Sequence, residues 1–195
     1  FLESRLGAAR AQYHKNYIIS ETHEGIIIID QHAAHERLIM EKMKSELSSN
    51  TIKTQMLLLP EIITLLPHHL EAISQHFETL RQLGLIIEAF GNDSVIVRET
   101  PALLGEVDAH KLVNDIAEEL DGLSNSTSLE DKISSVLATI ACHSSIRSGR
   151  ILSVAEMNQL LREMEITPNS GQCNHGRPTY ISLSLSDIER LFGRR

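Results

Sequence analysis

The feature that most constrains the fold is an unbroken apolar run, Gly25–Ile29, that ends directly in polar residues. Such a β-branched run is typical of a buried strand. The alanines that follow favour helix, so we expect the chain to turn from strand to helix at His32. Helical spacing then places His32 and Glu36 on one face, with Asp30 at the strand tip. A buried apolar strand rarely ends in several charged and imidazole side chains, so we expect these side chains to have a function.

The two cysteines of the chain each have a histidine nearby. Cys142 directly precedes His143. Cys173 is separated from His175 by one residue, in a loop that contains Gly and Pro. Zinc accepts thiolate, imidazole and carboxylate ligands together and is usually four-coordinate. The sequence offers more candidate ligands than one tetrahedral site needs, which indicates either two metal ions or one metal ion with an open coordination position. The candidate metal ligands are Asp30, His32, Glu36, Cys142, Cys173 and His175.

Other interpretations of these residues stay open. The histidines can be incidental residues of a solvated helix start, and an isolated cysteine is usually a small buried hydrophobe. A disulfide is not expected, because nothing in the sequence looks secreted and two cysteines form no framework. A Cys–His nucleophile pair is a further alternative. It leaves the acidic residues after the strand unexplained, so we favour a metal site.

Three segments together resemble the C-terminal domain family of the DNA mismatch repair protein MutL, in the lineages whose MutL nicks DNA. Asp30–Glu41 fits the family signature, Asp-Gln-His-Ala, two residues, Glu, four residues and Glu, at every specified position. The second motif corresponds to Ala141–Cys142 and the third to Cys173–Pro178. The opening Leu6–Tyr13 and the closing Phe192–Arg194 also match, so the resemblance covers nearly the whole chain.

Two positions depart from the family pattern. Asn174 stands where the family usually has proline, and His143 stands where a basic residue often follows the cysteine. Neither departure removes a presumed metal ligand.

The resemblance implies a metal-dependent endonuclease that nicks one DNA strand, using zinc and/or manganese. Arg177 is expected to neutralise the phosphate. Glu41 lies roughly 140° further round the helix than Glu36 by the helical period, so we expect it to support the site or its own helix. The implied catalytic residues are Asp30, His32, Glu36, Glu41 and Arg177, and the implied ligands are the six named above.

Two rival functions remain. One is a non-catalytic dimerisation platform with a structural zinc site, which would be closed and tetrahedral. The other is Cys-dependent acyl transfer, which requires a reactive Cys142 or Cys173. We expect Asp30→Asn to discriminate best between enzyme and platform, because a structural thiolate site has the least need of Asp30.

The resemblance also implies partners. The domain is expected to form a homodimer and to reach the mismatch-recognition protein MutS through the full-length protein. Gln55, Leu58 and Pro60 fit Gln-x-x-Leu-x-Pro, which is similar to the peptide that docks bacterial repair proteins on the sliding clamp. The alternative is a core strand over residues 56–59. A cytoplasmic, bacterial location is implied, with association with the nucleoid during repair.

The sequence predicts no nucleotide site, because it has no Gly-rich phosphate loop. The chain also begins without Met, so we expect a fragment of a longer protein, with ATP bound in a missing N-terminal domain. No run approaches the length of a membrane span, so we expect neither a membrane-spanning segment nor a signal peptide.

Charge argues against strong DNA binding by this chain alone. It carries 18 basic and 26 acidic residues, a formal net charge of −8, and phosphate contacts dominate non-specific affinity for DNA. Residues 142–195 are the exception, with seven Arg against five acidic residues, whereas residues 1–141 have 11 basic and 21 acidic residues. We therefore expect weak DNA binding that depends on another domain or a tethering partner.

The patterning predicts an α+β fold with two subdomains. Residues 1–66 and 124–195 are expected to form a discontinuous dimerisation subdomain that carries the motifs, and residues 67–123 an inserted external, regulatory subdomain. Within them we expect hairpins over 17–29 and 85–97 and a strand over 179–183. The expected helices span 67–83, 110–120 and 129–142, and two more begin with capping boxes at Ser153 and Ser186.

Overall fold

The computed structural model describes residues 2–49, 52–123, 126–144 and 150–194. The chain divides into two compact units. Unit 1 comprises Phe1–Glu41 and Ile146–Arg195, and unit 2 comprises Lys42–Ser145. Unit 1 is therefore discontinuous, as the sequence predicts, and the fold is α+β. No helix in the described ranges is long and apolar enough to cross a membrane.

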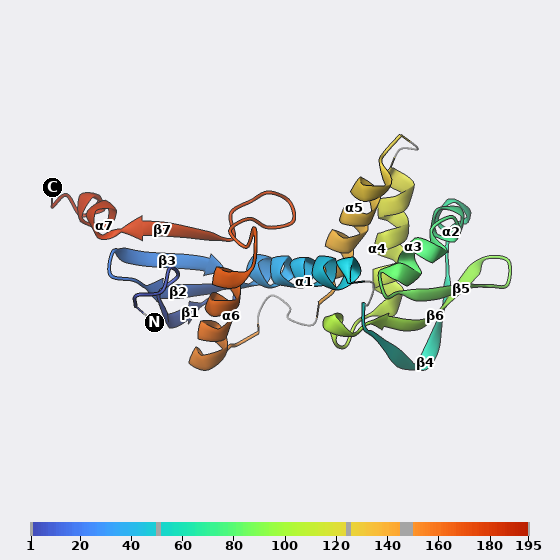
Figure 1. The fold of residues 1–195 in the computed structure, drawn as a ribbon, viewed down its shortest axis with the longest axis horizontal. Coiled ribbons are helices and arrows are strands. Elements are labelled where there is room, and N and C mark those ends of the chain that lie inside the picture. The colour runs from blue at the N-terminus through green and yellow to red at the C-terminus, as the bar shows by residue number, and fades with distance from the viewer. Residues whose placement is uncertain (1, 50–51, 124–125, 145–149, 195) are drawn as a thin grey trace. The chain divides into compact units, whose positions relative to one another are not determined.

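Unit 1 is built on an antiparallel sheet in the order β1-β2-β3-β7 (Figure 1). The isoleucine run forms the central strand β3, which pairs with β2 on one side and with β7 on the other. The strands are β1 (Ala8–Tyr13), β2 (Tyr17–Glu21), β3 (Gly25–Asp30) and β7 (Tyr180–Ser184). The helices are α1 (Gln31–Ser48), which continues into unit 2 from Lys42, α6 (Val154–Ile166) and α7 (Leu185–Leu191).

One face of this sheet is covered and carries the core of unit 1. Strand residues alternate between faces, so Ile27 and Ile29 are buried while Ile26 and Ile28 are only half-buried. The buried strand residues pack with the first turns of α1 and with α6, through Ala34, Leu38, Leu160 and Leu161 among others. This packing fixes the end of β3 against the start of α1, where the first motif lies.

Unit 2 has its own antiparallel sheet, in the order β4-β6-β5. Its helix α4 is strongly amphipathic and buries Leu112, Val113 and Ile116, and it packs against α2 and α5. The strands are β4 (Thr54–Thr64), β5 (Ile86–Phe90) and β6 (Ser94–Pro101). The helices are α2 (Pro67–Ser74), α3 (Phe77–Gln82), the 3-10 turn η1 (Ala102–Leu104), α4 (Ala109–Gly122) and α5 (Leu129–Cys142).

The segment predicted as the insert is too short. β4 pairs with β6 and α5 packs on α4, so both elements belong to unit 2 rather than to the outer segments 1–66 and 124–195. The insert therefore runs over 42–145 instead of 67–123. A strand or helix belongs with the element that buries it, and sequence periodicity does not identify that element.

Two predicted helix limits also need correction. The helix expected over 67–83 is interrupted at Gln75–His76, where Ser74 Oγ donates to the Leu70 carbonyl and the His76 ring bonds the Ala72 carbonyl. Such side-chain bonds to carbonyls of the preceding turn compete with the helical ladder. The last helix begins two residues earlier than predicted, because its capping box is formed by Ser184 and Asp187. The capping box at Ser153 and Glu156 is confirmed.

Candidate functional site

The junction between β3 and α1 is closed by the side chain of Asp30. Its Oδ1 accepts hydrogen bonds from the backbone N–H groups of His32 and Ala33, both at 3.0 Å. Gln31 N donates to the Asn16 carbonyl at 3.0 Å. A carboxylate at a helix start satisfies donors that have no intrahelical partner and suits the positive end of the helix dipole. Asp30 therefore has a structural role in addition to its predicted one.

The first turns of α1 bring His32 and Glu36 together, as the spacing predicts. His32 Nε2 lies 2.8 Å from Glu36 Oε1, and Glu36 is buried. The other ring nitrogen, His32 Nδ1, is also buried and has no hydrogen-bond partner among the described residues. A buried polar atom without a partner is unusual. The pair therefore retains ligand capacity that contacts within the chain do not use.

Glu41 lies away from this pair and contacts Arg37 instead. Arg37 Nη2 is 2.7 Å from Glu41 Oε1, with only 12% and 14% of the two side chains exposed. An i, i+4 pair of this kind stabilises its own helix. This is one of the two roles that the spacing predicts for Glu41.

The loop that carries Cys173 wraps backbone around the sulfur. Cys173 Sγ accepts the N–H groups of His175 and Arg177, both at 3.3 Å, and Cys173 N donates to the Arg177 carbonyl at 2.7 Å. Gly176 adopts φ +78° inside this turn, a conformation that glycine adopts without steric cost. Outer hydrogen bonds of this kind orient metal-binding side chains. Cys173 is buried, whereas His175 and Arg177 are exposed.

The first and third motifs adjoin neighbouring strands, because the first begins at the last residue of β3 and the third lies in the loop that precedes β7. Asp30 N donates to the Thr179 carbonyl at 2.9 Å, and Ile29 pairs with Tyr180. Thr179 is fully buried, and its hydroxyl donates to the Ser170 carbonyl. The sheet thus anchors the Cys173 loop beside the end of β3.

Cys142, the remaining predicted ligand, is the last residue of α5 in unit 2, whereas the other five predicted ligands lie in unit 1. It is exposed, and neither cysteine forms a disulfide. The adjacent His143 Nε2 lies 2.8 Å from Asp115 Oδ2. Among the described residues, the one group with three metal-ligating atoms within 4.8 Å of one another is His68, His69 and Asp121.

Asn174, at the position where the family resemblance leads us to expect proline, lies between Cys173 and His175. Both polar atoms of its side chain are buried without a hydrogen-bond partner in the described part of the chain. An amide in that state carries a desolvation cost. Asn174, in place of the expected proline, thus adds unsatisfied polar groups beside the presumed ligand Cys173.

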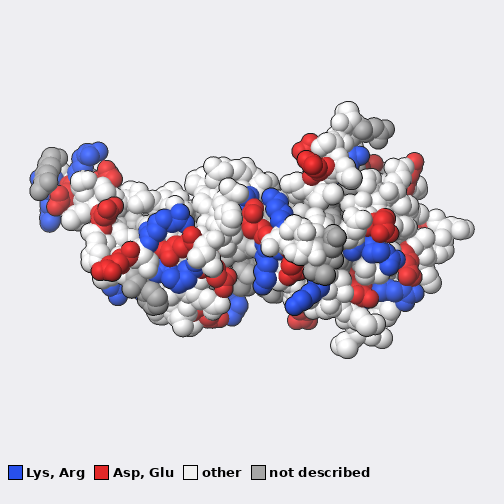
Figure 2. All heavy atoms as spheres, in the orientation of Figure 1, with Lys and Arg blue, Asp and Glu red and all other residues white. Residues whose placement is uncertain are grey.

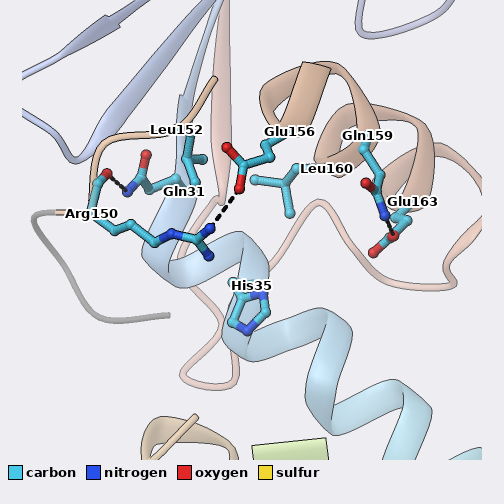
Figure 3. A pocket seen from close by; sticks show the side chains of 8 residues that line it. All are labelled: Gln31, His35, Arg150, Leu152, Glu156, Gln159, Leu160 and Glu163. Atoms are coloured by element: carbon cyan, nitrogen blue, oxygen red, sulfur yellow. Dashed lines mark hydrogen bonds and ion pairs between the residues drawn. The ribbon is translucent and has the colours of Figure 1, made fainter. Parts of the chain in front are cut away.

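A pocket of about 270 Å³ lies between α1 and α6 (Figure 3). His35 enters it from α1, and Arg150 closes one side by pairing with Glu156 at 2.5 Å. Burial lowers the pKa of His35 from 6.5 to about 4, although Glu163 opposes the shift. The pocket is lined by Gln31, His35, Arg150, Leu152, Glu156, Gln159, Leu160 and Glu163.

His35 is not among the site residues that the sequence predicts. It follows His32 by three positions, and that spacing is the signal that could have placed it beside the site.

The predicted clamp-binding segment forms part of β4. Its residues are not a core strand, because Met56, Leu58 and Leu59 are 79%, 101% and 80% exposed. Pairing with β6 shifts register between Met56 and Glu61, which bulges this stretch out of the sheet. Gln55 is turned inward, and its amide bonds the Gly105 carbonyl and, at 3.3 Å, Thr100 Oγ1.

The sequence of the chain is similar to known proteins of one family. The family model of the MutL C-terminal dimerisation domain matches residues 10–152. A protein of Rhizobium etli (strain CIAT 652) named DNA mismatch repair protein MutL is 58% identical over 189 residues, or 97% of this chain. A protein of Caulobacter vibrioides (strain NA1000 / CB15N) with the same name is 56% identical over 190 residues, again 97% of this chain.

The chain belongs to the MutL C-terminal dimerisation domain family. It spans 31% of the length of the Rhizobium etli relative and 30% of the Caulobacter vibrioides relative.

Proposed function

We propose that the chain acts in DNA mismatch repair as a self-associating domain that nicks one strand of DNA with bound divalent metal. Family membership and the names of the relatives support the repair role and self-association. The nuclease activity rests on the residues of unit 1. The observation that carries it is the backbone bond from Asp30 to Thr179, which joins the strand ending in the first motif to the loop of the third.

The types of donor present suit a divalent metal, although no three of the predicted ligand atoms lie within 4.8 Å of one another among the described residues. Imidazole, carboxylate and thiolate are each offered near the end of β3, by His32, Glu36 and Cys173. His32 Nδ1 lacks a partner among the described residues, and a bound ion would satisfy such an atom. The residues of unit 1 proposed to hold the metal are Asp30, His32, Glu36, Cys173 and His175. Cys142 lies in unit 2, and its role as a ligand stays an expectation from the family resemblance. A bound divalent ion supplies Lewis-acid polarisation of the scissile phosphate and a nucleophilic water at neutral pH.

The chain's own residues would position the phosphate. Asp30 holds the helix start, and its Oδ2 makes no hydrogen bond to a described residue. Because Asp30 and Asn16 already occupy the backbone N–H groups of residues 31–33, these donors are not available to an anion. The exposed Arg177 guanidinium has no ion pair within the described ranges, so it is the group that would neutralise phosphate charge.

Self-association has a candidate surface on the outer face of the unit 1 sheet. Cross-strand partners point to the same face, and the register aligns Ala11, Ile19, Ile28 and Ile181 in one row across all four strands. Ile26 and Leu183 form the neighbouring row. Ile181 is 51% exposed. A second copy of the chain would bury this apolar face, as homodimer interfaces do.

DNA would have to be brought to the domain by a partner. On the face drawn in Figure 2, acidic and basic side chains are interspersed within each unit, without a continuous basic stripe. With a net charge of −8, we expect this chain to bind DNA weakly, and a tight gel shift at low salt would contradict that. We propose the exposed stretch around Leu58 as the docking segment for a sliding clamp, because exposed apolar side chains can fill a partner's groove.

A structural zinc site without catalysis is the alternative function. The hydrogen bonds around Cys173 Sγ favour it, since they hold the thiol in a fixed loop. Chelation separates the two functions. If the metal is catalytic, EDTA abolishes manganese-dependent nicking of supercoiled plasmid while far-UV circular dichroism and the melting temperature change little. If it is structural, EDTA unfolds unit 1 and no nicking is seen with manganese before chelation.

A further inference from the structure

We propose that His68, His69 and Asp121 form a second metal site, in unit 2, that binds a divalent transition-metal ion and ties the start of α2 to the end of α4. One ligand atom from each of the three residues lies within 4.8 Å of the other two. This site lies outside the three motifs and is independent of the proposed nuclease activity.

The two helices hold the three side chains in place. Pro67 occupies the first turn of α2, so His68 and His69 follow directly at its N-terminal end. Asp121 follows the buried Leu120 in the last turn of α4. The two helices pack against each other within unit 2 (Figure 1). A site supported by rigid elements is preorganised, because the ligands need only side-chain rotation to close on an ion.

The spacing suits a tetrahedral ion. Metal–ligand bonds of about 2.0–2.2 Å place two ligands of one tetrahedral zinc roughly 3.3 Å apart. The ligand atoms are at most 4.8 Å apart, so closing on an ion requires only a small adjustment, and His68 and Asp121 are exposed. The rings of His68 and His69 are in edge-to-face contact, with centroids 4.4 Å apart. The exposure leaves the fourth position to water, so the site is open rather than closed.

The electrostatics around Asp121 favour a cation. Its carboxylate lies at the negative end of the α4 dipole, where a negative charge is unfavourable, and the last turn of α4 has no basic residue. None of the three side chains has a hydrogen bond or ion pair to another residue within the described ranges, apart from the ring contact between the histidines. A bound ion would offset the charge of Asp121 at the helix end.

The donor set selects the class of metal. Imidazole suits zinc, copper and nickel, whereas magnesium, calcium and manganese prefer oxygen ligands. Two imidazoles and one carboxylate therefore favour Zn²⁺ over Mn²⁺ or Mg²⁺. The site should fill with zinc even when manganese is in excess.

The test is calorimetric titration of Zn²⁺ into the metal-stripped chain and into Asp121→Asn and His69→Gln. The unaltered chain is expected to bind one equivalent of Zn²⁺ at this site. Both variants should bind that equivalent at least about tenfold more weakly. Even the loss of an outer-shell partner lowers metal affinity by about this factor. His110→Gln is the matched control, because His110 is an exposed histidine on the same α4 outside the cluster. It should retain the equivalent.

Folding is checked in EDTA, where the melting temperatures of the variants should match that of the unaltered chain, because neither His69 nor Asp121 makes a hydrogen bond or ion pair in the described ranges and Asp121 is exposed. Added Zn²⁺ should then raise the melting temperature of the unaltered chain more than that of Asp121→Asn. Equal zinc stoichiometry and affinity in the unaltered chain and in both variants would overturn the site. Loss of the same equivalent in His110→Gln would overturn it too, because it would show adventitious binding to exposed histidines.

Discussion

Asp30 donates its backbone N–H to the carbonyl of Thr179 at 2.9 Å. This bond joins the residue that ends β3 to the residue that precedes β7, so a strand pairing brings together two motifs from opposite ends of the chain. The side chain of Asp30 meanwhile caps α1. One residue therefore links the helix that carries His32 and Glu36 to the loop that carries Cys173.

The capping role predicts different stabilities for two substitutions of Asp30. Asn caps helices about as well as Asp, so Asp30→Asn should keep the melting temperature in EDTA close to that of the unaltered chain. Asp30→Ala leaves the N–H groups of His32 and Ala33 without their partner and should cost about 0.5–2 kcal/mol in free energy of unfolding. Urea denaturation of both variants measures this difference. Equal stability of Asp30→Ala and the unaltered chain would contradict the capping role.

The outer sheet face predicts the effect of a buried charge on self-association. Ile181→Glu should raise the dissociation constant of the homodimer by roughly 100-fold or more, because an unpaired carboxylate would be buried at the interface. Sedimentation equilibrium measures the constant. The matched control is Ile166→Glu at the end of α6, where the side chain is 83% exposed and lies away from the strand rows. A dimer that survives Ile181→Glu unchanged would exclude this face.

The exposed stretch of β4 predicts a loss of clamp binding without a loss of fold. Leu58→Ala should weaken binding to a sliding clamp by about 30-fold, as expected for a hot-spot residue, and leave the melting temperature unchanged, because Leu58 is fully exposed. Leu66→Ala, at another exposed leucine of unit 2, serves as the control in the same surface-plasmon-resonance assay. Equal clamp affinity for Leu58→Ala and Leu66→Ala would refute the docking role.

Burial of His35 predicts a pH dependence of stability in the metal-free chain. Its pKa is lowered in the fold from 6.5 to about 4, so the unfolded chain takes up the proton first as the pH falls. The contribution of the neutral ring is therefore fully present above pH 6.5 and is lost between pH 6.5 and 4, by at most about 3 kcal/mol.

Urea titrations in EDTA at pH 7.5 and 5 check this. His35→Gln should reduce the difference in free energy of unfolding between the two pH values, whereas His23→Gln removes an exposed imidazole and is the control. An unchanged difference in His35→Gln would show that the ring is not buried as described.

Much of unit 1 could be predicted because local chemistry determines it. The isoleucine run, the alanines after it and the Ser153 capping box each specify an element without reference to distant residues. The spacing of His32 and Glu36 likewise predicts their contact. These features depend on strand alternation, helical period and capping, which operate within a few residues.

What could not be predicted depends on which elements pack together. The assignment of β4 and α5 to unit 2 follows from pairing with β6 and packing on α4, and neither partner is marked in the sequence. The cluster of His68, His69 and Asp121 likewise forms only because α2 packs on α4. The capping by Asp30, in contrast, has a local sequence signal, an Asp directly before a helix.

We propose that the residues around Asp30 make the chain a metal-dependent nicking enzyme. It is tested most directly by nicking of supercoiled plasmid in Mn²⁺, with and without a sliding clamp, by the unaltered chain and by Asp30→Asn. We expect the unaltered chain to nick the plasmid and the clamp to enhance the nicking. Asp30→Asn should lose the nicking while its fold and its dimer stay intact. Equal nicking by Asp30→Asn, or no manganese-dependent nicking by the unaltered chain even with the clamp, would contradict it.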